Sequence, residues 1–176
     1  ALFQAIPAPL GELSQNMRLQ SSSRVEVLTT GDELIEGTWR DLHSQTIAHS
    51  VSDSGGMIYR FNTVGDHLGE LITTLDEITQ RAAVCIVTGG LGPTVDDLTV
   101  DALSSAAAVD APIIEERWKE IITRFPQLKS AESSNRRQAR LPQGAIHLSN
   151  NRGTAPGIYM QIHGCHVFAF PGPPNE

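Results

Sequence analysis

The sequence predicts an α/β fold built on a mostly parallel sheet with helices on both faces. Short apolar segments typical of strands alternate with amphipathic helical segments, the connections between them are short, and glycine-rich or acidic turns follow the strands. Strands that alternate with helices in this way form parallel sheets that are covered on both sides. The chain has 176 residues, 40% of them hydrophobic, which suits one globular domain with a full core.

The first half of the chain supplies alternating strands and helices. Strands are expected where apolar segments are bounded by turn residues, and helices where apolar residues recur with a period of about 3.6. The helix that begins at Leu68 shows this period clearly, with Leu71, Leu75 and Ile78 on one face. The expected elements are a strand at 25–29, a helix at 42–54, a strand at 57–64, a helix over 68–78, a strand at 84–88 and a helix ending near 107.

The second half adds one helix and three strands. Apolar residues at helical spacing predict a helix over 114–125, in which Trp118 belongs to the core. Strands are expected at 145–148, 157–162 and 167–170, the last two joined as a hairpin that turns at residues 163–166.

Residues 1–23 are interpreted as an N-terminal extension or leader. They mix prolines, glutamines and a serine triplet with scattered apolar residues, and they lack the basic start and long apolar core of a signal peptide. The domain itself is therefore placed at residues 24–176.

Composition argues against several classes of partner. The net charge of −7, with 13 lysines and arginines, leaves little for a sequence-independent nucleic-acid surface. Nothing approaches the ~18 uncharged apolar residues of a membrane-spanning helix, so no membrane partner is expected. Cys85 and Cys165 show neither metal-binding spacing nor a disulfide framework, which indicates a reducing compartment, the cytoplasm.

Residues 84–99 predict a site for a phosphate. A strand ends at Thr88, and Gly89, Gly90 and Gly92 then allow backbone N–H groups to approach an anion without interference from Cβ atoms. The positive end of the helix that follows lies toward the same place. Three glycines alone are equally consistent with a tight connection between a strand and a helix.

Acidic residues in two turns extend this prediction to a divalent metal. Asp96 and Asp97 would repel a bare phosphate, so a cation is expected beside them. Helix capping by Asp97 or Thr94 is the alternative, although a cap needs only one residue. Asp32 follows the strand at 25–29, and the carboxyl ends of parallel strands meet at one edge of a sheet. We therefore expect Asp32, Asp96 and Asp97 at one site.

A basic run and two loops have less specific signals. Residues 135–140 carry three arginines, which either form a solvated helix face or hold a phosphate or carboxylate through guanidinium contacts. The loops at 151–157 and 171–174 are either rigid turns or parts of a binding pocket.

Five motifs in a fixed order resemble a known family. They lie at residues 30–35, 89–99, 135–138, 153–157 and 171–174. Together they resemble the molybdopterin-binding domain of the CinA-like competence/damage-inducible proteins over residues 24–176. The resemblance implies a three-layer α/β sandwich of the molybdenum cofactor biosynthesis (MoaB/MogA-like) type, assembled as a homo-oligomer, a dimer or a trimer. The family's usual continuation past the Pro-Gly motif is missing, so truncation at the C-terminal end is expected.

The resemblance also implies a function. CinA-like members are associated with metal-dependent hydrolysis of nucleotide diphosphates such as ADP-ribose, a similar domain precedes FAD synthetases, and Mg²⁺ or Co²⁺ is the expected ion. It implies catalytic roles for Asp32 and Asp97, with Asp32, Asp96 and Asp97 as metal ligands. The residues that it implies for binding a nucleotide or pterin phosphate are Thr30, Gly31, Thr88, Gly89, Gly90, Gly92, Thr94, Arg136, Thr154, Pro171, Gly172 and Pro173.

Departures from the family pattern leave three hypotheses open. Asp96-Asp97 replaces the Arg-Asp of related pterin-adenylylating enzymes, which favours the CinA-like branch over a molybdenum cofactor biosynthesis protein. Leu42-His43 and His67 stand where other residues are usual, which leaves the choice of ligand open. The domain is then a metal-dependent pyrophosphatase, a non-catalytic module that binds molybdopterin or another phosphorylated heterocycle, or an oligomerisation scaffold whose site has decayed.

Overall fold

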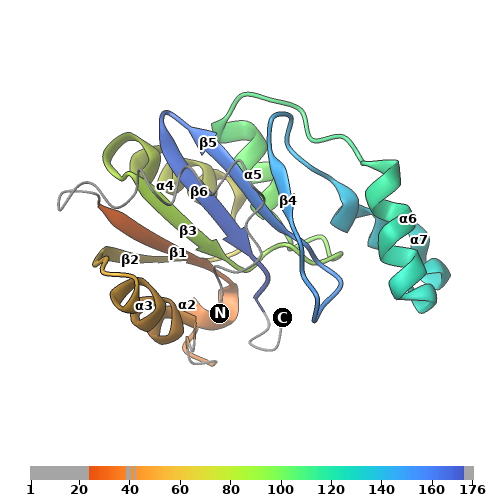
Figure 1. The fold of residues 1–176 in the computed structure, drawn as a ribbon, viewed down its shortest axis with the longest axis horizontal. Helices are drawn as coiled ribbons and strands as arrows, with labels where there is room; N and C mark the ends of the chain where they lie inside the picture. The colour runs from red at the N-terminus through yellow and green to blue at the C-terminus, as the bar shows by residue number, and fades with distance from the viewer. Residues whose placement is uncertain (1–23, 39–40, 42, 173–176) are drawn as a thin grey trace.

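The computed structural model describes residues 24–38, 41 and 43–172. The extension at 1–23, Leu42 and Pro173 lie outside these residues. The described chain contains a single six-stranded sheet (Figure 1). Its strands are β1 (Val25–Thr30), β2 (Ile58–Val64), β3 (Val84–Thr88), β4 (Ile146–Leu148), β5 (Gly157–Ile162) and β6 (Cys165–Phe170).

The sheet is mostly parallel, as the sequence predicts. The strand order is β2-β1-β3-β6-β5-β4, in which β2, β1, β3 and β6 run parallel and β5 runs antiparallel to β6 and β4. The carboxyl ends of four strands therefore lie at one edge of the sheet, and this edge carries the candidate site.

Helices connect the strands. They are α2 (Asp32–Ile35), α3 (His43–Asp53), α4 (Leu68–Arg81), α5 (Thr99–Ala106), α6 (Glu115–Arg124) and α7 (Glu132–Asn135), with 3₁₀ helices η2 (Pro126–Ala131) and η3 (Arg136–Ala139). The longer elements agree with the predicted ones to within about three residues. The short helices α2, α7, η2 and η3 were not predicted, because so few residues show no periodicity. No helix in the described part of the chain is long and apolar enough to cross a membrane.

Two cores on opposite faces of the sheet give the domain its three layers. On one face α4 and α5 pack Leu71, Leu75 and Leu103 against sheet residues that include Cys85 and Cys165. Burial raises the pKa of both thiols, that of Cys165 to about 12, so neither is a ready nucleophile. On the other face α3 packs against the sheet in a smaller core formed by Val25, Val51 and Val84 with Ile47, Ile58, Ala83, Ile86 and Phe168.

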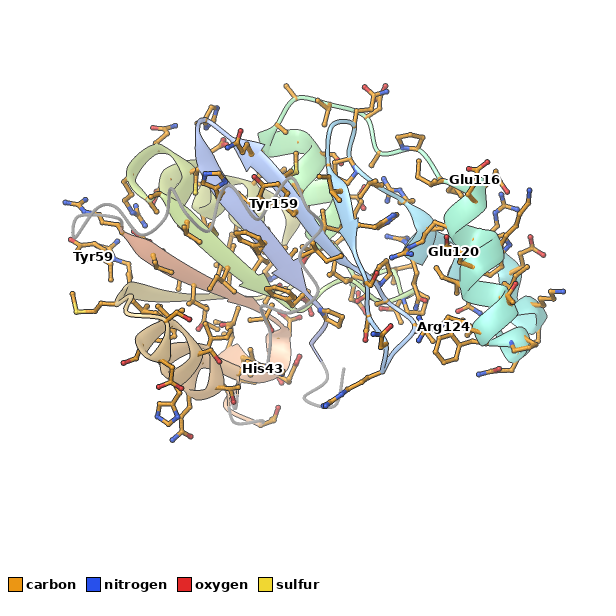
Figure 2. The ribbon with its side chains drawn as sticks, in the orientation of Figure 1. His43, Tyr59, Glu116, Glu120, Arg124 and Tyr159 are labelled. Carbon is orange, nitrogen blue, oxygen red and sulfur yellow. The ribbon has the colours of Figure 1, made fainter. Side chains whose placement is uncertain are left out.

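The helix α6 lies beside the sheet rather than on one of its faces (Figure 1). It buries Trp118 and Ile121 against Ala139 in a third, small core. Its opposite side exposes Glu116, Glu120 and Arg124 (Figure 2).

The hairpin between β5 and β6 is tighter than the sequence predicts. Its turn consists of His163 and Gly164 alone, at φ values of 51° and 85°. Two consecutive residues at positive φ are typical of the two-residue hairpin turn whose twist matches that of the strands. Cys165 and His166, expected in the turn, are instead the first residues of β6.

A buried ion pair joins β1 to α4. The carboxylate of Glu26, fully buried, accepts hydrogen bonds from Arg81 Nε (2.8 Å) and Nη2 (3.0 Å) and from Asn62 Nδ2 (3.1 Å). The hydrogen bonds from Arg81 lower the pKa of Glu26, against the opposing effect of burial. Arg81 is therefore the main partner that compensates the charge of Glu26.

Replacing Arg81 tests this pair. We expect Arg81→Met to lower the free energy of unfolding by about 3–5 kcal/mol at pH 7, because it leaves a buried carboxylate without its partner. Glu77→Gln removes only the exposed partner of Arg81 and should cost less than about 0.5 kcal/mol. Urea unfolding measures both changes, and equal losses in the two variants would contradict the importance of the buried pair.

The same pair predicts a pH dependence. Because the pKa of Glu26 is lowered in the folded state, its contribution to stability is present above the unfolded pKa and is lost as the pH falls through the folded value. We expect the deficit of Arg81→Met to shrink on acidification below about pH 4.3, the ordinary glutamate pKa. Urea unfolding between pH 7 and pH 3 checks this, and a deficit that does not change with pH would contradict it.

Candidate functional site

Loops from four strands meet at the carboxyl edge of the sheet. After β1, the N–H of Gly31 donates to the carbonyl of Val64, the last residue of β2 (3.2 Å). After β3, the N–H of Gly89 donates to the carbonyl of Phe170, the last residue of β6 (3.1 Å). A Cβ atom at Gly89 would lie 2.6 Å from the carbonyl oxygen of Thr30, so only glycine allows this close approach. The structure thus brings Thr30, Gly31 and Gly89 together as predicted.

The glycine turn after β3 is held from behind by the first residue of α5. Thr99, almost fully buried, donates its hydroxyl to the carbonyl of Gly89 (2.8 Å) and its N–H to the carbonyl of Gly90 (3.1 Å). Within the described residues, the N–H groups of Gly90 and Leu91 have no protein hydrogen-bond partner. Successive free amides in such a turn form an anion-binding concavity. Thr88, the last residue of β3, is buried directly before this turn.

Asp97 closes the loop that follows the glycines. Its carboxylate accepts hydrogen bonds from the N–H of Gly92 (2.7 Å) and from both the N–H (2.7 Å) and the hydroxyl (2.6 Å) of Thr94. Neither Asp97 nor Thr94 caps α5, since Leu98 is the N-cap residue. Asp97 therefore has a structural task in shaping the predicted phosphate loop, while its neighbour Asp96 is exposed.

A second pair of carboxylates lies where β1 and β2 end. The N–H of Asp66 donates to Asp32 Oδ1 (2.9 Å), and the N–H of Asp32 donates to Asp66 Oδ2 (3.3 Å). The hydroxyl of Thr30 also donates to Asp66 Oδ1 (3.1 Å). Asp66 was missed as a site residue, although its place directly after a strand is the signal that identified Asp32.

The predicted metal ligands are not gathered into a cage. Among the described residues, no three His, Cys, Asp or Glu side chains are close enough to hold an ion together. Mg²⁺ is commonly bound by one or two carboxylates with phosphate oxygens of a substrate completing the shell. Carboxylates at this edge fit a metal only in that arrangement, so the assignment of Asp32, Asp96 and Asp97 stays a prediction.

The arginine that reaches the glycine loop is not the one expected. Arg136 forms ion pairs with Glu115 and with Glu132 (3.0 Å) on α6 and α7. Its neighbour Arg137 instead places Nη2 3.5 Å from the carbonyl oxygen of Asp97. The sequence identified the basic run but could not tell which side chain faces the loop.

The remaining predicted binding residues lie in loops next to β5 and β6. Asn150 organises the loop before β5, because its side chain binds the carbonyl of Ala155 (2.9 Å) and the N–H of Gly153 (3.0 Å) around the partly buried Thr154. Pro171 and Gly172 follow β6, and a Cβ atom at Gly172 would lie 3.4 Å from the Cα of Gly89. Gly172 therefore lies beside the glycine turn.

Comparison with known proteins identifies the family. The model described as "Probable molybdopterin binding domain" matches residues 26–176. The chain belongs to this family. The domain is 41% identical over 152 residues to a CinA-like protein of Desulfosudis oleivorans, covering 86% of this chain and 37% of the relative. It is 39% identical over 155 residues to a CinA-like protein of Escherichia coli K12, covering 87% and 38%. It thus spans a little over a third of the length of these curated relatives.

Solved structures confirm the fold of this molybdopterin-binding-family domain. CinA of Thermoplasma acidophilum, described as having unknown function, superposes with a TM-score of 0.80 at 26% identity, covering 88% of this chain and 92% of that one. MoaB of Thermus thermophilus gives a TM-score of 0.57 at 16% identity, with coverage of 86% and 82%, and shows the fold alone. The expected MoaB/MogA-like α/β sandwich and the resemblance to CinA-like proteins are both confirmed.

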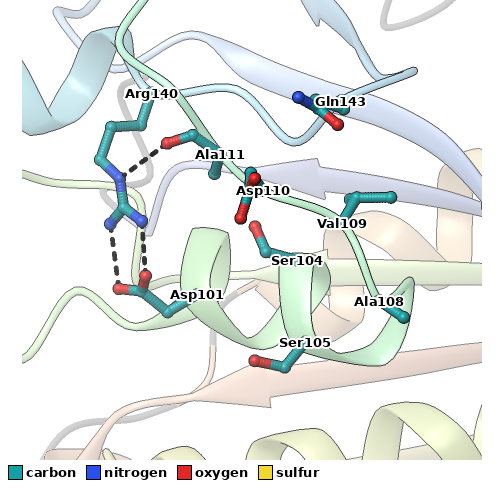
Figure 3. Close-up of a pocket in the computed structure, with 9 residues that line it drawn as sticks. All are labelled: Asp101, Ser104, Ser105, Ala108, Val109, Asp110, Ala111, Arg140 and Gln143. Atoms are coloured by element: carbon teal, nitrogen blue, oxygen red, sulfur yellow. Dashed lines mark hydrogen bonds and ion pairs between the residues drawn. The ribbon is translucent and has the colours of Figure 1, made fainter.

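A surface pocket lies along α5 and does not include the loops at this edge. It has a volume of about 440 Å³ and is lined by α5 and residues 108–111, with Arg140 and Gln143 (Figure 3). None of the predicted site residues lines it.

Removing the carboxylate of Asp97 tests its structural task. We expect Asp97→Ala to speed amide hydrogen exchange at Gly92 and Thr94 by at least about tenfold, because both amides lose their charged acceptor. Asp96→Ala, at the exposed neighbour, should leave both rates unchanged. Hydrogen exchange followed by NMR measures this, and equal protection in the two variants would show that Asp97 does not hold the loop.

Proposed function

We propose that the domain binds a small phosphorylated ligand, a nucleotide diphosphate or a pterin phosphate such as molybdopterin, at the carboxyl edge of its sheet. The observation that carries this proposal is the turn at Gly89 and Gly90, whose carbonyls are held by Thr99 and whose following amides have no protein partner among the described residues. Unpaired amides are costly unless a ligand or water satisfies them, and a phosphate supplies several acceptors. Membership of a molybdopterin-binding family supports the same ligand class.

The finer proposal is hydrolysis of a nucleotide diphosphate of the ADP-ribose or FAD type with a divalent metal, Mg²⁺ or Co²⁺. Asp32, in its reciprocal contact with Asp66, places two carboxylates at the ends of neighbouring strands. Together with phosphate oxygens of the substrate, these carboxylates would provide the oxygen ligands that a divalent ion such as Mg²⁺ prefers. The metal would supply charge neutralisation and an activated water. In this scheme the side chains orient the ion, and the glycine turn holds the phosphates.

A second candidate is a binding module without turnover. Asp97, predicted to be catalytic, already accepts three hydrogen bonds from its own loop. A carboxylate engaged in this way shapes a site more readily than it activates water. This candidate predicts retention of molybdopterin or a nucleotide without product. In both candidates we propose a homo-oligomer, a dimer or a trimer, as the working form.

Turnover assays with a variant of Asp32 separate the candidates. We expect the protein to hydrolyse ADP-ribose, FAD or CoA only with Mg²⁺ or Co²⁺, and Asp32→Asn to lower the rate at least about a hundredfold, because the amide no longer balances the charge of the ion. The amide oxygen in this variant would still accept the hydrogen bond from the N–H of Asp66, so the loops should stay in place. Chromatography of the products measures the rate.

The matched control is Asp53→Asn, an exposed aspartate in the last turn of α3. It should turn over at the wild-type rate. Ligand binding without product in the wild type would favour the binding module, and metal-independent turnover would contradict the hydrolytic proposal.

A further inference from the structure

We propose that Arg137 holds the second phosphate of a diphosphate ligand beside the turn at Gly89 and Gly90, and that it thereby makes the domain select diphosphates over monophosphates. The inference deepens the proposed function and rests on it. The backbone amides of the glycine turn would bind one phosphate. The guanidinium of Arg137 would bind the second phosphate through paired N–H donors.

Arg137 lies at the rim of the loop that Asp97 closes. Its Nη2 is 3.5 Å from the carbonyl oxygen of Asp97 and 3.7 Å from Asp101 Oδ2. The side chain is 31% exposed, so it is accessible from the surface. Both contacts are at or beyond the upper limit of a good hydrogen bond. The guanidinium is thus placed beside the loop without being firmly held there.

Asp101 does not need Arg137 as a partner. Both of its carboxylate oxygens already receive hydrogen bonds from Arg140, at 2.6 Å and 3.1 Å, while Arg140 Nε donates to the carbonyl of Ala111 (Figure 3). Arg140 is therefore committed to a bidentate pair. Arginine has five N–H donors, and the nitrogens of Arg137 other than Nη2 form no hydrogen bond or ion pair among the described residues.

The carboxylates nearest to Arg137 already have other partners. Asp101 lies in the first turn of α5, where the helix dipole is positive, and two guanidinium groups share its one negative charge. The nearby carboxylate of Asp97 is already engaged by Gly92 and Thr94. Phosphate suits this position, because the planar guanidinium matches two of its oxygens.

Arg136 provides the contrast within the same segment. It is bound to carboxylates on two sides, Glu115 and Glu132, and faces α6 and α7. Two neighbouring arginines thus have different tasks. Arg136 joins η3 to the helices behind it, and Arg137 faces the loop.

Binding of a diphosphate and a monophosphate to matched variants tests the proposal. The ligands are α,β-methylene-ADP, which resists hydrolysis, and AMP, each with Mg²⁺ in calorimetric titrations of the full chain. We expect Arg137→Gln to weaken binding of the diphosphate about 10- to 100-fold, because charge-assisted hydrogen bonds to one phosphate are lost. Binding of AMP should weaken less than about threefold. Arg136→Gln should leave the ratio of the two Kd values unchanged.

The outcomes distinguish failure of the proposed phosphate site from failure of the proposed role of Arg137. A wild-type protein that binds neither ligand overturns the proposed phosphate site and the role of Arg137 with it. A wild-type protein that binds both, with the same ratio of Kd values in Arg137→Gln as in Arg136→Gln, overturns only the role of Arg137. Partial recovery of the ratio in Arg137→Lys would support a direct charge contact. Thermal unfolding should be unchanged in Arg137→Gln, because its present contacts are long.

Discussion

The candidate site depends on one close approach between two backbones. The chain leaves β3 through Gly89 so near to the carbonyl of Thr30 that a Cβ atom would lie 2.6 Å from it. This approach is possible because β1 and β3 are parallel neighbours that end at the same edge of the sheet. It sets the turn close enough to α5 for Thr99 to hold both of its carbonyls, which leaves the amides beyond them to a ligand.

Much of the fold follows from local patterns. The apolar period of α4 and the short buried strands β1 and β3 were predicted because burial of one helix face, or of both strand faces, leaves a strong signal over many residues. The short helices between α6 and β4 left no such signal. Their positions depend on tertiary contacts, such as the packing of Trp118 against Ala139, which no local pattern shows.

The sequence predicted which loops come together at the candidate site, but it predicted less well which side chains face that site. Turns after parallel strands share an edge, so the grouping of Thr30, Gly31 and Gly89 followed from topology. Which of two adjacent arginines faces the loop depends on a rotation of one residue in a 3₁₀ helix, where Arg136 meets Glu115 and Glu132. The catalytic role of Asp97 stays a prediction, and the three hydrogen-bond donors that engage its carboxylate could not be read from the sequence.

Asp97 has different hydrogen-bond partners from Asp32 and Asp66, and this difference suggests how one fold can support several reactions. Asp97 is hydrogen-bonded within its own loop and shapes the turn that we propose binds phosphate. The side-chain carboxylates of Asp32 and Asp66 each accept a hydrogen bond from the other's backbone N–H, and each can accept further ones. Substitution there would change metal affinity and reaction without disturbing this turn. Binding and chemistry would then reside on separate loops of one sheet, so that a family can retain a phosphorylated ligand while the reaction differs among its members.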